Sequence, residues 1–317
     1  MLDQPKVFVH TNDQQIVGAL VSAYSMKKAT KSSDAFDVKL IRLEQTPHLW
    51  KRQGQNYLRK GRQAVWYNED LQSFSPLRRM VPQLMGYKGR AVVTDPDVFA
   101  AGDIYDLLSM EMGGKAILCR NIKTGYKDSG NAFYASSVML LDCSKLTHWR
   151  WDQEIDEMFT GKLDYGPWIG LNSEDPDIIG ELSEEWNSFD KLEPHTKLLH
   201  LTERSTQPWK TGLPVDFDLN IQSARLGGIK GIVRSLLGRK ALVPALPAFY
   251  RPHPDSKQEK FFFDLLKEAM EAGEIDEDFV QNRVEANDVR PDIFNLLYSR
   301  SHRPSGQKGK LVSACGL

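Results

Sequence analysis

Cysteine is scarce in this sequence. Its three cysteines, Cys119, Cys143 and Cys315, are too few and too scattered for a disulfide framework, and no Cys/His group has the spacing of a zinc site. Long apolar runs are absent as well, and none approaches the roughly 18 residues that a membrane-spanning helix needs. The N-terminus has neither the basic end nor the apolar stretch of a signal peptide. We therefore expect a cytoplasmic protein.

The sequence also lacks an excess of charge of either sign. Its 41 Lys and Arg residues are balanced by 42 Asp and Glu residues, which gives a formal net charge of -1. A protein that binds nucleic acid through its overall charge would be strongly basic, so we expect no nucleic-acid partner. The hydrophobic fraction of 41% is that of an ordinary globular chain, and 317 residues are enough for one large domain or two smaller ones.

The first 43 residues have the pattern of an α/β fold. A short apolar run over residues 6–11 predicts a buried strand, and Asn12 or Asp13 is suited to cap the helix that follows. Apolar residues at helical spacing over 16–24 predict that helix, and alternation over 36–43 predicts a second strand. Strand, helix and strand in this order are typical of an α/β domain.

Later segments continue this pattern up to about residue 210. Further strands are predicted over 90–94, 115–120, 133–142 and 197–201, and helices over 76–85, 103–110 and 151–159. The segment 44–75 is harder to interpret, because it is polar and aromatic and predicts only a short strand at 62–67.

The character of the chain then changes. The segment 225–240 has five basic residues and no acidic one, and helical patterns follow over 255–272 and 277–286. We predict an α/β domain over residues 1–215 and a mainly helical extension over 216–317, with a frayed tail.

Two features suggest a metal site. Asp95 and Asp97 lie two residues apart, directly after an apolar strand, where open α/β sheets bind ligands. Carboxylate oxygens are suitable ligands for Mg²⁺ or Mn²⁺, and a neutral imidazole such as that of His200 would complete the set. The alternative is a simple strand-end turn, since Asp and Pro favour turns, together with a hydrogen-bonded core histidine.

Arg78 and Arg79 precede the Asp-Pro-Asp strand on a predicted helix. Guanidinium groups bind phosphate or carboxylate in a fork geometry, so either residue could reach an anionic ligand. The alternative is a solvated helix face.

Six short motifs follow one another along residues 6–210. They are a strand with Thr-Asn-Asp and Gly-Ala-Leu-Val (residues 7–21), Asp95-Pro96-Asp97, the strand 134–142, Asp164-Tyr165-Gly166, Trp186-Asn187, and His200 through Pro208-Trp209. In this order they resemble the motifs of glycogenin-like glycosyltransferases.

The resemblance implies a Rossmann-like GT-A domain that moves a hexose from a nucleotide-sugar, usually a UDP-sugar, with retention of configuration and with Mn²⁺ or Mg²⁺. It implies that Asp95, Asp97 and His200 are the metal ligands and that Arg78 or Arg79 reaches the donor. Asp164 would lie beside the sugar near the reacting carbon. The other donor contacts that it implies are Thr11, Asn12, Asp13, Gln15 and Lys210.

Several positions depart from the family pattern. Gln15 stands where the family has a base-stacking Tyr, and Gln207 replaces a Lys that contacts the diphosphate, for which Lys210 is a candidate substitute. Ala135 and Ser137 replace the usual Asn and Gly. These losses motivate a second hypothesis, a catalytically weak or inactive nucleotide-binding or interaction module. A nucleotidyltransferase would need a Gly-rich loop after the first strand, and none is present.

The basic segment 225–240 suggests a contact with anionic membrane, because cationic amphipathic helices bind such surfaces. We therefore expect a glycan, a small molecule or a lipid-linked sugar as acceptor, and a location in the cytoplasm that includes the inner face of the membrane. The alternative for this segment is a solvated helix that covers one edge of the α/β domain.

Overall fold

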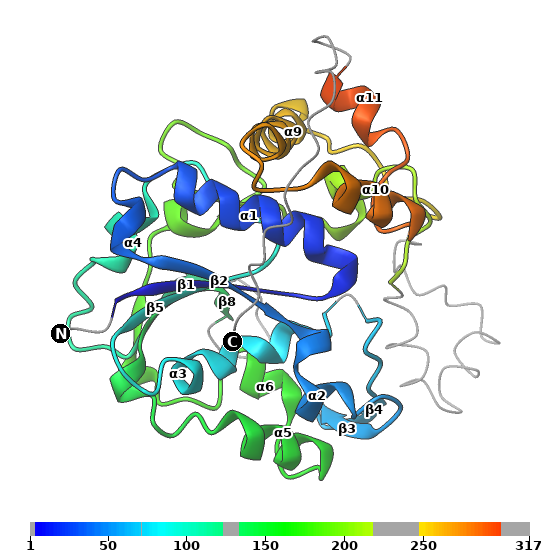
Figure 1. Cartoon of the computed structure of the whole chain (residues 1–317). Helices are drawn as coiled ribbons and strands as arrows, with labels where there is room; N and C mark the ends of the chain where they lie inside the picture. Colours follow the sequence, from blue (N-terminus) through cyan, green and yellow to red (C-terminus); the bar gives the residue numbers. More distant parts are fainter. Residues whose placement is uncertain (1–3, 71, 123–132, 218–246, 299–317) are drawn as a thin grey trace, which may run out of the picture.

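The structure is a computed structural model that describes residues 4–70, 72–122, 133–217 and 247–298. Its centre is a six-stranded sheet in the order β2-β1-β5-β8-β7-β9 (Figure 1). β1 is parallel to β2 and β5, and β7 is parallel to β9, whereas β8 is antiparallel to both of its neighbours. The strands are β1 (Lys6–Thr11), β2 (Asp37–Arg42), β5 (Arg90–Thr94), β7 (Ile117–Ile122), β8 (Phe133–Asp142) and β9 (Ile179–Glu181). The α/β fold class is confirmed.

Two smaller sheets complete the strands of the described residues. β6 (Val98–Ala100), β11 (Leu198–His200) and β10 (Ser188–Phe189) form a three-stranded sheet in which β11 is antiparallel to β6. β3 (Asn56–Arg59) and β4 (Arg62–Val65) form an antiparallel hairpin at the edge of the molecule, beside the short helix α2 (Pro47–Trp50) (Figure 1). The hairpin occupies the segment whose pattern is difficult to interpret from sequence.

Helices cover both faces of the central sheet. α1 (Ile16–Lys28) lies on one face, and the short helices α3 (Val81–Leu84), α5 (Trp151–Phe159) and α6 (Tyr165–Ile169) lie on the other (Figure 1). α2 (Pro47–Trp50) contacts α5, and α4 (Ile104–Leu108) contacts β5. Short 3-10 helices are η1 (Asp13–Gln15), η2 (Ser33–Ala35), η3 (Leu43–Gln45), η4 (Ser75–Met80), η5 (Cys143–Lys145), η6 (Pro176–Ile178), η7 (Glu184–Asn187), η8 (Arg204–Thr206) and η9 (Pro208–Lys210).

The helix expected over residues 76–85 is divided in two. Residues Ser75–Met80 form a 3-10 helix, and only Val81–Leu84 are α-helical. Pro82 has no amide hydrogen to donate to the preceding turn, so a continuous α-helical hydrogen-bond ladder cannot pass through it.

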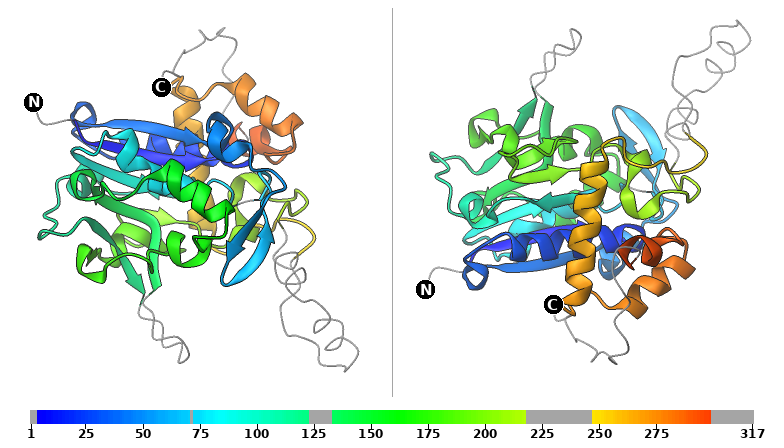
Figure 2. Two further views of the ribbon diagram at one scale, coloured as in Figure 1. Left: turned by 90° about the horizontal axis from the view of Figure 1, so that it is seen from below. Right: turned by 90° about the horizontal axis from the view of Figure 1, so that it is seen from above.

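The C-terminal part is helical, as expected. Its helices are α9 (Ser256–Glu271), α10 (Glu277–Glu285) and α11 (Ile293–Tyr298). Helix α9 lies across α1 (Figure 2). Phe262 of α9 stacks against Trp209 with ring centroids 5.0 Å apart and meets Phe99 at 5.5 Å. Because buried residues of α1, β11 and the three helices form one apolar cluster, the extension shares a core with the α/β part.

The predicted basic segment 225–240 and the predicted frayed tail lie outside the described residues. Within the ranges that the structure describes, no helix has the length and apolar character needed to cross a membrane.

Candidate active site

Pairing between segments that are distant in the sequence brings Asp95, Asp97 and His200 together. Asp95 follows the last residue of β5, and its amide donates to the carbonyl of Ser137 at 3.0 Å. Asp97 precedes β6, and its carbonyl accepts from the amide of Leu201 at 3.0 Å. Since β6 pairs with β11 so that Val98 lies opposite His200, the imidazole reaches the two carboxylates. One ligand atom from each of the three side chains lies within 4.8 Å of the others.

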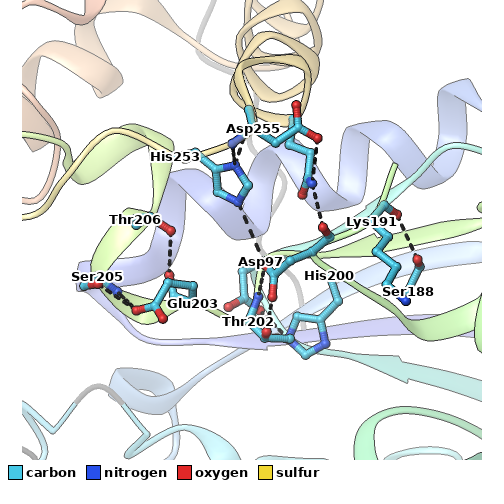
Figure 3. Close-up of polar contacts among 12 residues, drawn as sticks. Asp97, Ser188, Lys191, His200, Thr202, Glu203, Ser205, Thr206, His253 and Asp255 are labelled. Atoms are coloured by element: carbon cyan, nitrogen blue, oxygen red, sulfur yellow. Dashed lines mark hydrogen bonds and ion pairs between the residues drawn. The ribbon is translucent and has the colours of Figure 1, made fainter. Parts of the chain in front are cut away.

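A hydrogen bond fixes the orientation of His200. Its Nδ1 lies 2.9 Å from Oδ1 of Asn187, and the Asn187 amide nitrogen donates to Oγ of Ser137 at 3.0 Å. An amide oxygen only accepts, so Nδ1 carries the hydrogen and Nε2 points toward Asp97 Oδ1, 3.4 Å away (Figure 3). A ring nitrogen held in this way is typical of a metal-ligating histidine. Burial disfavours the charged imidazole, but Asp97 raises the pKa of His200, because the carboxylates make the site negative.

Arg78 and His10 hold the second carboxylate. Arg78 Nη2 donates to Asp95 Oδ2 at 2.6 Å, and its Nη1 donates to Ser136 Oγ at 2.9 Å. The fully buried His10 places Nε2 2.8 Å from Asp95 Oδ1 and 3.1 Å from Arg78 Nε. Burial alone would raise the pKa of the Asp95 carboxyl, but Arg78 and then His10 hold it well below its usual range. Asp95 is therefore ionised at neutral pH.

The donor set fits a divalent cation. The two carboxylates carry two negative charges, and Arg78 offsets only one of them. The side chains of Asp95 and Asp97 are only 13% and 15% exposed. Asp97 Oδ1 is buried and accepts no hydrogen bond from the described residues. Two carboxylates and one imidazole suit Mn²⁺ or Mg²⁺.

Gly18 explains why helix α1 packs so close to this site. A Cβ atom at Gly18 would lie 2.9 Å from the carbonyl oxygen of Pro96 and 2.9 Å from the ring of Trp209. The absence of a side chain at Gly18 therefore lets α1 contact the Asp-Pro-Asp loop directly.

The residues expected to contact the nucleotide lie at the carboxyl end of β1. Asn12 caps η1 by accepting from the amide of Gln15 at 3.1 Å, and its Nδ2 donates to Ser73 Oγ at 3.3 Å. Asp13 is paired with Arg42. Thr11 and Gln15 are fully buried, and neither polar atom of the Gln15 side chain is hydrogen-bonded within the described parts of the chain.

Arg79 and Lys210 are engaged elsewhere. Arg79 donates to Glu154 and Glu174 at 2.7 Å each and lies over the ring of Trp149 at 4.0 Å, so it stabilises the packing of α5. Lys210 is fully buried and paired with Asp216. The structure thus brings Arg78, and not Arg79, to the carboxylates.

Asp164 accepts three backbone hydrogen bonds. The amides of Lys60 and Gly61 donate to it at 2.7 and 2.6 Å, and the amide of Gly166 donates at 2.9 Å. It therefore caps α6 and ties this helix to the turn of the β3–β4 hairpin. These hydrogen bonds outweigh partial burial and lower the pKa of its carboxyl. Lys60 has a φ of 51° and Gly61 a φ of 72°, and the bonds to Asp164 help to hold this two-residue turn.

The C-terminal extension is connected to the strand that carries His200. The carboxylate of Asp190 accepts from the amide of Thr202 at 2.9 Å, and the amide of Asp190 donates to the His200 carbonyl at 3.0 Å. Gln258 of α9 donates to the carbonyl of Asp190 at 2.8 Å. Through Asp190, the extension therefore supports the backbone from the His200 carbonyl to Thr202.

Sequence reasoning missed His10 and Asn187 as parts of this site. His10 is a polar residue near the end of an otherwise apolar strand, next to the loop where ligands bind, which was an available signal. Asn187 belongs to one of the short motifs, but its contact with His200 depends on the pairing of β10 with β11, which no local pattern shows.

Comparisons with known proteins give similarity of structure only. No protein-family model matches the sequence, and no curated protein matches it. The galactosyltransferase LgtC, solved with donor and acceptor sugar analogues, is 13% identical over 64% of this chain and 89% of its own, with a TM-score of 0.46. GlyE of Streptococcus pneumoniae is 15% identical over 65% of this chain but only 56% of its own, with a TM-score of 0.45. Mouse xyloside xylosyltransferase 1 is 14% identical over 62% of this chain and 97% of its own, with a TM-score of 0.40.

Proposed function

We propose that this protein is a metal-dependent glycosyltransferase that moves a hexose from a nucleotide-sugar, a UDP-sugar in particular, to an acceptor with retention of configuration. The observation that carries the proposal is the Asp95, Asp97 and His200 cluster, in which two carboxylates and an oriented imidazole converge beyond the strand ends. The resemblance of the motif order over residues 6–210 supports the same reaction class.

In this proposal Asp95, Asp97 and His200 hold Mn²⁺ or Mg²⁺. The bound cation supplies positive charge that offsets the charge on a diphosphate leaving group. Asn187 keeps the His200 ring in place through its 2.9 Å contact. Arg78 is fixed by Asp95, Ser136 and His10, and each of its Nη atoms keeps one further hydrogen that can be donated to the nucleotide-sugar.

Thr11, Asn12 and Asp13 form the nucleoside end of the proposed donor site. They lie at the carboxyl end of β1, at the same edge of the sheet as the metal ligands. Gln15 takes the position of the base-contacting residue, and its buried amide, which has no hydrogen-bond partner among the described residues, is suited to bind a base.

The configuration of the transferred sugar is retained if the leaving diphosphate assists deprotonation of the acceptor on the same face of the sugar. Asp164 is a poor nucleophile or base in the described geometry, because backbone amides occupy both of its oxygens and lower its pKa. The chain then contributes by positioning the reactants and by neutralising charge.

One observation favours a second candidate, a nucleotide-binding module without activity. Lys210, the candidate substitute for the missing diphosphate-contacting lysine, is paired with Asp216 and withdrawn from solvent. A module of this kind would bind the nucleotide and fail to turn over the nucleotide-sugar.

A thermal-shift experiment tests the proposed donor site. We expect UDP with Mn²⁺ to raise the melting temperature by roughly 5 °C at a hundredfold excess over Kd, because a ligand that binds only the native state stabilises it by about 2.7 kcal/mol. UDP without the cation should give a much smaller shift. No shift with any nucleoside diphosphate and Mn²⁺ would contradict the proposal. Turnover of UDP-sugars then separates the enzyme from the inactive module, and the anomeric configuration of the product reports on retention.

A further inference from the structure

A narrow hollow lies between the β3–β4 hairpin, the loop that follows it and the start of α6. Its lining includes Tyr57, Arg59, Tyr67, Asp70, Gln72 and Tyr165. Its volume is about 10 Å³, which is room for roughly one water-sized group. The hollow therefore fits a small chemical group and not a whole sugar ring.

Arg59 brings positive charge into this hollow. Its Nη1 donates to the Tyr57 hydroxyl at 3.2 Å, its Nη2 donates to Gln72 Oε1 at 3.4 Å, and its guanidinium lies 5.0 Å from the centroid of the Tyr165 ring. Within the described ranges it makes no ion pair at 4.0 Å or less, and the Asp70 carboxylate, which also lines the hollow, acts on it electrostatically. Charged groups withdrawn from water are usually paired, so this guanidinium is suited to receive an oxyanion.

Aromatic side chains are exposed beside the hollow. Tyr67 lines it and is 37% exposed, and Trp50 is 42% exposed. The carbonyl of Trp50 accepts from the side chain of Asn68, so the two aromatic residues lie on adjoining backbone. Tyr and Trp provide an apolar face with a polar edge. Such a surface suits a pyranose ring, whose C–H face is apolar and whose rim carries hydroxyl groups.

The hollow adjoins the candidate metal centre. Ser73 lines it and accepts a hydrogen bond from Asn12, which belongs to the proposed nucleoside end of the site. Burial raises the pKa of the Tyr165 hydroxyl, and both Arg59 and Arg78 act to lower it, so Tyr165 lies within electrostatic range of both guanidiniums. Arg78 in turn binds Asp95 at 2.6 Å. A donor at the metal centre would therefore have this hollow on its flank.

On the basis of the proposed function, we propose that the hollow and Tyr67 form an acceptor subsite for a sugar that carries a carboxylate or a phosphate. One oxygen atom of the oxyanion enters the hollow and pairs with Arg59, while the rest of the anion stays at its mouth and the sugar ring lies against Tyr67. The acceptor is then an acidic sugar, either a uronic acid or a sugar phosphate.

Saturation-transfer NMR on the full chain with Mg²⁺ and UDP tests this proposal. The probes are methyl β-D-glucuronide, glucose 6-phosphate and the uncharged methyl β-D-glucoside. We expect one or both acidic sugars to bind at least about tenfold more tightly than the uncharged one, and the comparison of the two tells carboxylate from phosphate. Arg59→Gln should remove this preference. Arg62→Gln, at the exposed position opposite Arg59 in the hairpin, is the matched control and should leave it intact.

Gln72→Glu is a second variant that keeps Arg59 in place. A carboxylate at this position would pair with the guanidinium and compete with the ligand, so binding of the acidic sugars should fall to that of the uncharged one. Equal binding of charged and uncharged sugars, an unchanged preference in both variants, or displacement of the probes by UDP would overturn the proposal.

UDP binding is titrated separately on the same samples. If UDP binds and the acidic sugars do not, the acceptor proposal alone is overturned. If the acidic sugars bind through Arg59 and UDP does not bind, the proposed function is overturned.

Discussion

Asp97→Asn is expected to abolish metal-dependent turnover. The substitution keeps the size of the side chain but removes one of the two anionic ligands, so we expect Mn²⁺ affinity to fall by at least about 100-fold and donor hydrolysis by about 1,000-fold. Calorimetric titration with Mn²⁺ and a UDP-sugar hydrolysis assay measure the two effects.

The fold of this variant should remain intact. Asp97 accepts no side-chain hydrogen bond at Oδ1 within the described residues, and its backbone contact to Leu201 does not depend on the side chain. Asp106→Asn is a suitable control, because the side chain of Asp106 is 60% exposed and lies on α4. Wild-type Mn²⁺ affinity in the Asp97→Asn variant would exclude the proposed ligand set.

Phe262→Ala is expected to lower the free energy of unfolding by about 3–5 kcal/mol. The Phe262 ring is fully buried and contacts Trp209 and Phe99 at centroid distances of 5.0 and 5.5 Å, so its removal leaves a cavity between α9 and the α/β part. Urea denaturation followed by tryptophan fluorescence measures the change.

The same variant tests whether the extension is part of one core. Phe249→Ala is the control, because Phe249 is 56% exposed and its loss should change stability by less than about 0.5 kcal/mol. A cooperative unfolding transition that shifts for the Phe262 variant alone agrees with the shared core. An unchanged midpoint, or a separate early transition for residues 247–298, would show that the extension folds independently.

The α/β opening was predictable because its local patterns agree with the final structure. The apolar run at 6–11, the helical spacing over 16–24 and the alternation at 36–43 correspond to β1, α1 and β2. The strand ends agree to within about one residue, whereas α1 continues to Lys28. The candidate carboxylate pair was predictable for the same reason, since Asp95 and Asp97 directly follow an apolar strand.

Contacts between distant segments were not predictable from local patterns. His200 reaches Asp97 only through the antiparallel pairing of β11 with β6, which the motif order suggests and no periodicity shows. Arg78 and Arg79 are adjacent, and their different directions depend on a 3-10 turn that places neighbouring side chains on different faces. Likewise, only the three-dimensional structure shows that Lys210 is buried and paired with Asp216.

The position of a bound cation tests the central claim most directly. Crystals grown with Mn²⁺ and UDP should show an anomalous scattering peak between the carboxylates of Asp95 and Asp97 and Nε2 of His200, at ligand distances of roughly 2.0–2.3 Å. The diphosphate of UDP should complete the coordination. A well-ordered UDP with no peak at these three side chains, or a peak held by other residues, would contradict the assignment of this cluster as the metal centre.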